Sequence, residues 1–121
     1  FVETRFVGVN GSSTGGTVAI RAAAEDPRIQ AMVLRVPRSY AATPPLAQMG
    51  QAPTLIIQGS EDMIVLPESQ EIFEALQCPK ELHIVQGAGH LFDEKAEYSE
   101  EMTDSTVSWF TRWFKQLAEA D

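Results

Sequence analysis

The chain has 121 residues, of which 44% are hydrophobic and 21% charged, and these fractions are ordinary for a globular protein. Its net charge of −8 and its pI near 4.6 argue against binding to nucleic acid or to an anionic membrane, because both attract basic surfaces. The length allows one domain with a modest core, and we take residues 1–121 as that domain.

Cysteine and histidine are too few to build a metal centre or a disulfide framework. The lone Cys78 cannot form an internal disulfide, so we expect a reducing, cytoplasmic location. No apolar run reaches the length of a membrane span. No group of cysteines and histidines has the spacing of metal ligands. We therefore predict a protein that uses no metal and no cofactor.

The first predicted elements are a strand over residues 5–10 and a helix from Thr14 to about Glu25. The segment Gly11–Gly15 between them fits the pattern G-x-S-x-G, with Ser13 at its centre. A serine at the tip of so tight a turn has strained dihedral angles, so the side chains two before and two after it must be minimal. The amino end of the helix directs N–H groups and positive charge toward its hydroxyl.

The same segment also admits a plainer interpretation, as a glycine-rich loop without chemistry or as a weak phosphate-binding turn. It lacks the Lys-Ser/Thr ending of a P-loop, and the chain contains no G-x-G-x-x-G pattern, so nucleotide binding is poorly supported.

The rest of the chain alternates strands and helices, which predicts an α/β fold with a parallel sheet of about four strands. The later strands are nearly continuous apolar runs, as expected where both faces of a strand are covered. The expected elements are a strand over 29–36, a connection over 37–53 with one helical turn around 45–49, a strand over 54–58, a helix from Pro67 to Cys78, a strand over 81–85 and a helix over 100–118.

The last helix carries a wide apolar stripe that includes four large aromatic side chains. They are Trp109, Phe110, Trp113 and Phe114. A helix that lay alone on the surface would leave these aromatic rings exposed to water, so we expect at least two of them to pack on the sheet.

Three residues able to act in nucleophilic catalysis follow the carboxyl ends of three predicted strands. Ser13 follows the first strand, Asp62 the third and His90 the fourth. The carboxyl ends of parallel strands meet at one edge of the sheet, where ligand sites form. A serine hydroxyl needs a neutral imidazole to accept its proton, and a carboxylate must orient that imidazole.

With these motifs the chain resembles the C-terminal half of an α/β-hydrolase, in the branch of dienelactone hydrolases and carboxylesterases. The matching stretches are residues 8–16, 55–62 and 87–92. The resemblance implies Ser13 as the nucleophile, His90 as general base and then acid, and Asp62 as the orienting acid. It also implies the Thr14 N–H as one oxyanion donor and a small ester or lactone as substrate, hydrolysed through an acyl-serine.

Each of these residues also has a plainer interpretation. Asp62 could be an ordinary turn or capping aspartate, with Glu61 a weaker competitor for the acid, and His90 a loop histidine with a satisfied hydrogen bond. Arg35 and Arg38 flank the end of the second strand, where they could bind a substrate carboxylate. Surface arginines held in salt bridges are the alternative account of both.

The resemblance also indicates what stands outside this sequence. Such hydrolases have several strands before the turn that carries the serine, and those strands carry the second oxyanion donor. We therefore expect either a piece of a longer protein or a chain completed by a second copy, pairing the strand Arg5–Asn10 across a two-fold axis. The alternative function is a non-catalytic hydrolase-like binding or assembly module. A nucleotide-binding flavodoxin-like domain ranks last, because it gives Asp62 and His90 no role.

Overall fold

The computed structural model describes residues 6–120, in which four strands form one parallel sheet in the order β1-β2-β3-β4. This confirms the predicted fold class. The elements are β1 (Val7–Ser12), α1 (Thr14–Glu25), β2 (Ile29–Arg35), α2 (Thr43–Met49), β3 (Thr54–Gly59), α3 (Leu66–Ala75), β4 (Lys80–Val85) and α4 (Ala96–Ala120).

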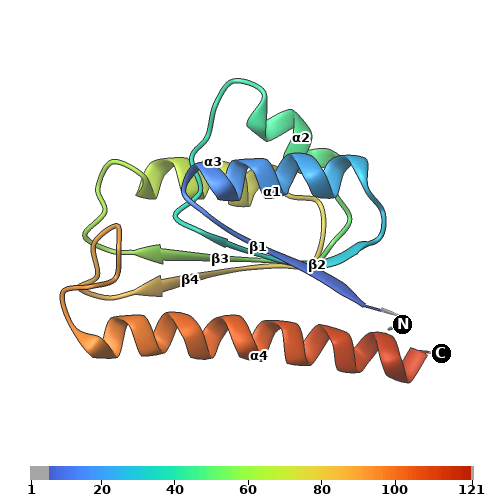
Figure 1. The fold of residues 1–121 in the computed structure, drawn as a ribbon. Coiled ribbons are helices and arrows are strands. Elements are labelled where there is room, and N and C mark those ends of the chain that lie inside the picture. Colours follow the sequence, from blue (N-terminus) through green and yellow to red (C-terminus); the bar gives the residue numbers. More distant parts are fainter. Residues whose placement is uncertain (1–5, 121) are drawn as a thin grey trace.

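The helices form a layer on each face of the sheet. Figure 1 shows α1, α2 and α3 together on one face and α4 alone along the other. The strand order explains this arrangement, because right-handed crossovers between strands that advance in one direction bring every connecting helix to the same face. Only α4, which follows the last strand, is left to cover the second face.

Each face of the sheet has its own buried core. Because side chains alternate along a strand, Leu34 and Ile56 face α1, α2 and α3, while Val33 and Ile57 face α4. All six residues of β3 are buried, as expected for a central strand. Among residues 6–120, no helix combines the length and apolarity needed to cross a bilayer.

The aromatic stripe of α4 packs against the second face of the sheet. Trp109 is buried, and Phe110 and Trp113 pack against the same core. Phe110 and Phe114 stack with ring centroids 5.6 Å apart. The prediction that at least two of the four rings pack on the sheet is confirmed.

Some boundaries differ from those predicted. β1 extends through Ser12, because Gly11 and Ser12 still pair with β2. The proline-rich connection contains a full helix, α2, whose prolines occupy its first turn, where no N–H is needed. α4 begins at Ala96, before the apolar stripe, since its first turns are largely solvent-exposed and leave no periodic signal.

Candidate functional site

Ser13 stands at the junction of β1 and α1 in a backbone conformation that is rare for a residue with a side chain. Its φ is 55° and its ψ is −122°, so the prediction of a strained serine at this turn is confirmed. The Ser13 N–H donates to the Arg35 carbonyl oxygen, 2.8 Å away, which ties the turn to the end of β2. The Ser13 carbonyl in turn accepts the Gly16 N–H at 2.9 Å.

Close packing around the turn explains two of its glycines but not the third. A Cβ on Gly11 would lie 2.3 Å from the Gly15 carbonyl oxygen, so no larger residue fits there. A Cβ on Gly16 would lie 3.1 Å from Pro37 Cβ. A Cβ on Gly15 would meet nothing within 4 Å. The expectation that the position two after Ser13 must be minimal is therefore wrong on steric grounds, since Gly16 is the tight position.

The same turn leaves backbone donors at the amino end of α1. The first N–H groups of a helix have no carbonyl partner within it. The N–H groups of Ser13 and Gly16 are bonded to Arg35 and Ser13, whereas those of Thr14 and Gly15 open the helix. These two are the backbone donors that the turn can offer to an anion formed at the Ser13 hydroxyl.

Asp62 and His90 come together at the same edge of the sheet, as predicted. Nδ1 of His90 lies 2.5 Å from Oδ2 of Asp62. The Asp62 side chain is only 7% exposed and that of His90 is 38% exposed, so the carboxylate is shielded while the imidazole is accessible. With Nδ1 bonded to the carboxylate, Nε2 is the nitrogen left to face a substrate or a hydroxyl.

Backbone contact between two loops produces this pair. The turn after β3 carries Asp62 and the loop after β4 carries His90, and the Glu61 N–H donates to the Ala88 carbonyl oxygen at 2.9 Å. Gly59 permits this approach, because a Cβ there would lie 2.3 Å from the same oxygen. A second link runs from the Gly87 N–H to Ser60 Oγ at 2.8 Å. Glu61, the competing acid, is exposed.

The sheet places Ser13 at the same edge as His90. β1 is separated from β3 by β2, and all the strands are parallel, so Ser13, Asp62 and His90 stand at one edge. A hydrogen bond between the Ser13 hydroxyl and His90 Nε2 stays a prediction.

The two arginines at the end of β2 have different surroundings. Arg38 pairs with Glu68 of α3 at 3.1 Å, in agreement with the salt-bridge account of that residue. Arg35 faces α4, and its Nη1 lies 3.7 Å from Met102 Sδ. The structure does not bring the two guanidinium groups together on one ligand position, and substrate binding by either stays a prediction.

Glu68 was missed by sequence reasoning. Burial alone would raise the pKa of Glu68, but the Ser39 N–H and the Arg38 guanidinium outweigh burial and hold that pKa below its usual value. Glu68 in turn raises the pKa of Arg38. A single glutamate in the first turn of a helix carries no sequence signal for such a partner 30 residues away.

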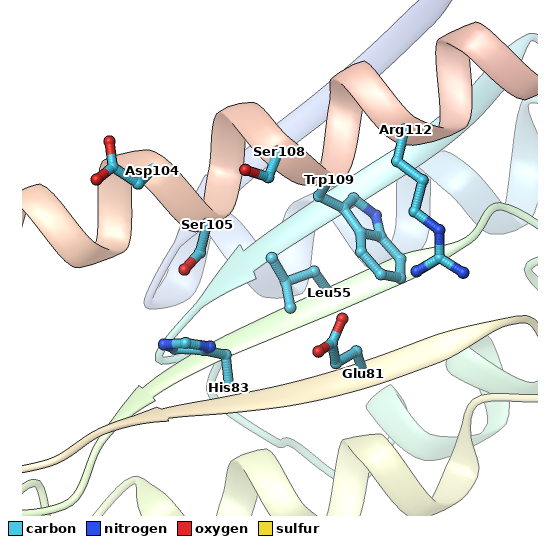
Figure 2. Close-up of a pocket in the computed structure, with 8 residues that line it drawn as sticks. All are labelled: Leu55, Glu81, His83, Asp104, Ser105, Ser108, Trp109 and Arg112. Carbon is cyan, nitrogen blue, oxygen red and sulfur yellow. The ribbon is translucent and has the colours of Figure 1, made fainter.

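A cavity of about 320 Å³ lies away from these residues, between β4 and α4. Figure 2 shows Glu81 of β4 opposite Trp109 and Arg112 of α4, and His83 further along the strand, opposite Ser105. His83 Nε2 lies 2.7 Å from Glu101 Oε2, which links the edge strand to the helix. Neither this cavity nor any other part of residues 6–120 holds three metal-ligating side chains together.

Comparison with known proteins gives the family and the fold of the chain. A family model described as PETase, PET hydrolase-like, matches residues 1–118. A dienelactone hydrolase from Anabaena variabilis superposes with a TM-score of 0.80 at 37% identity, covering 88% of this chain and 49% of that one. The esterase domain of a Rhodothermus marinus protein also gives a TM-score of 0.80, covering 88% of this chain and 60% of that one, but its 17% identity supports the fold alone.

Two Mycobacterium tuberculosis proteins provisionally named phosphoribosyl transferases are 38% identical to this chain over 106 residues. The match covers 86% of this chain but 23% of each of those proteins. The chain thus spans about half the length of the matched dienelactone hydrolase and less than a quarter of these relatives.

Proposed function

This chain belongs to the PET hydrolase-like family, and from that membership we propose that it supplies the nucleophile, base and acid of a serine hydrolase. The observation that carries the proposal is the short contact between Asp62 and His90, at the sheet edge where Ser13 adopts its strained turn. A capping aspartate or an ordinary loop histidine would not require the two loops to meet in this way.

In the proposed reaction the Ser13 hydroxyl attacks the carbonyl carbon of an ester while His90 Nε2 accepts its proton. Asp62 accepts the Nδ1–H, which fixes the tautomer with Nε2 unprotonated and stabilises the imidazolium once it forms. The tetrahedral intermediate collapses to an acyl-serine as His90 returns the proton to the leaving alcohol. A water molecule activated by His90 then attacks the acyl-serine and releases the carboxylic acid.

The Thr14 N–H is the proposed oxyanion donor from this chain, since it stands at the positive end of α1 directly after the nucleophile. The resemblance assigns the second donor to strands that precede the turn carrying Ser13. Loss of one such donor costs about 3 kcal/mol of transition-state stabilisation. We therefore expect Ser13 to be labelled by a reactive probe, with weak turnover by the 121 residues alone.

The proposed substrates are small carboxylic esters or lactones, and the name of the dienelactone hydrolase relative supports the lactones among them. The phosphoribosyl transferase name is not carried over, because the match covers only 23% of those proteins. Nor does the turn at Ser13 have the lysine of a phosphate-binding loop.

Labelling with a fluorophosphonate probe tests the proposal, since the probe reacts covalently with an activated serine. Labelling should vanish in Ser13→Ala and persist in Ser12→Ala, which removes the neighbouring hydroxyl as a matched control. His90→Gln should slow labelling by about 10²-fold or more, as expected for the loss of a general base. A folded wild-type chain that is not labelled at Ser13 would refute the assignment and favour the non-catalytic module.

A further inference from the structure

Three residues other than glycine have positive φ among residues 6–120, and all follow strands at the edge that carries Ser13. They are Ser13, Val36 and Phe92, with φ of 55°, 45° and 57°. The conformation of Ser13 belongs to its turn, and Phe92 lies in the loop after His90. Val36 belongs neither to the serine turn nor to the histidine loop, and it takes no part in the proposed chemistry.

Valine is poorly suited to this conformation. Its branched Cβ clashes with the backbone at positive φ, and the proline that follows restricts it further. Val36 is nevertheless 1% exposed, packed in the core between the sheet and α4. Backbone strain of this kind persists only where the surroundings enforce it, and it gathers at functional sites.

The contacts on both sides of Val36 show what its conformation achieves. The Arg35 carbonyl accepts the Ser13 N–H at 2.8 Å, while the Val36 N–H donates to the Ile57 carbonyl at 2.9 Å. The chain then turns so that Pro37 lies beneath Gly16, whose added Cβ would stand 3.1 Å from Pro37 Cβ. The kink at Val36 therefore places the Arg35 carbonyl against Ser13 and Pro37 against the start of α1.

Contacts further along hold the segment in place. The Arg38 carbonyl accepts the Thr17 hydroxyl of α1 at 2.6 Å. The Ser39 N–H donates to Glu68 of α3 at 2.8 Å. The segment is thus fixed to both neighbouring helices, and the buried Val36 side chain anchors its first residue in the opposite core.

We propose that Val36 is a positioning residue for Ser13, acting by holding the Arg35 carbonyl and Pro37 against the turn that presents the serine. The functional importance of Val36 rests on the proposed role of Ser13. Whether Val36 holds the Ser13 turn in place can be tested without any turnover.

Hydrogen exchange of individual amides in the 121-residue chain tests it. Val36→Ala should lower the protection of the Ser13 amide at least tenfold relative to the Ile56 amide of β3, with a similar slowing of probe labelling per folded molecule. Val33→Ala is the matched control, because it removes the same atoms from the same core at a residue without positive φ. It should affect both amides equally and leave labelling per folded molecule unchanged.

Pro37→Ala acts on the same support and should also lower protection selectively at Ser13, which provides a second test if Val36→Ala does not fold. Val36→Ile keeps the branched side chain and should retain Ser13 protection. Equal loss of protection at Ser13 and Ile56 in both Val36→Ala and Pro37→Ala would overturn the inference. Because amide exchange needs no chemistry, an unlabelled wild-type Ser13 would count against the proposed function alone.

Discussion

Replacing Gly59 with alanine should separate Asp62 from His90 without touching either residue. A Cβ at Gly59 would lie 2.3 Å from the Ala88 carbonyl oxygen and 2.7 Å from that of Gly89. Both atoms are backbone of the loop that leads to His90, so no flexible side chain can yield in their place.

The structure sets the size of the effect. A real Cβ keeps at least 3.0 Å from such an oxygen, so the loop must withdraw by 3.0 − 2.3 = 0.7 Å or more. The Glu61–Ala88 hydrogen bond of 2.9 Å and the Asp62–His90 contact of 2.5 Å both span this junction. Forced overpacking costs about 1–3 kcal/mol of stability, and a displacement near 1 Å in a catalytic group costs about 10²-fold in rate.

Urea denaturation and fluorophosphonate labelling together measure the two effects. Gly50→Ala is the matched control, because its added Cβ would meet only the Ala47 carbonyl oxygen, at 4.0 Å, and alanine readily adopts its φ of −73°. The Gly59→Ala protein should lose both stability and labelling rate, whereas the Gly50→Ala protein should lose neither. Wild-type stability and labelling of Gly59→Ala would refute the argument that backbone contact between the two loops builds the site.

Three further predictions concern the stability and assembly of the chain. Trp109→Ala should lower the free energy of unfolding by about 3–5 kcal/mol, while Val107→Ala, at a residue 58% exposed, should change it by less than about 0.5 kcal/mol in urea titrations. Because the folded-state pKa of Glu68 is depressed, its carboxylate favours folding above the usual glutamate pKa, and this contribution is lost as the pH falls. The free energy of unfolding of Glu68→Gln should therefore fall less steeply on acidification than that of the wild type, and an equal fall would contradict the pairing. We also expect self-association through the edge strand β1, so light scattering at micromolar concentration should give the mass of two chains, and the mass of a single chain would exclude it.

The sequence predicted the sheet and the Asp62–His90 pair because both depend on local patterns. Apolar runs marked the strands, and the positions of the two residues just after strands brought them to one edge. The close contact at Gly59 was not predictable, because it depends on how two loops separated by some thirty residues pack. The strain at Val36 was hidden for the same reason, since its sequence context is an apolar strand that meets a proline.

The full extent of α2, of which one helical turn was predicted, and the partner of Glu68 also lay beyond the sequence. Prolines at the start of α2 made its segment resemble a connection, although proline is tolerated in the first turn of a helix. The pairing of Glu68 with Arg38 follows from the packing of α3 against the end of β2, which no short-range pattern specifies.

Asp62 and His90 are supported by two strands that pair with each other, whereas Ser13 is supported from one side of its strand. Asp62 and His90 follow β3 and β4, which pair with each other and are tied together by the loop contacts at Gly59. Ser13 follows β1, which among the described residues pairs with β2 alone and is anchored through the Arg35 carbonyl. The acid and histidine should therefore form their contact in the isolated chain, whereas the reactivity of Ser13 should rise when a further strand covers the open side of β1. If covering that side leaves labelling unchanged, the support from β2 is sufficient by itself to position the serine.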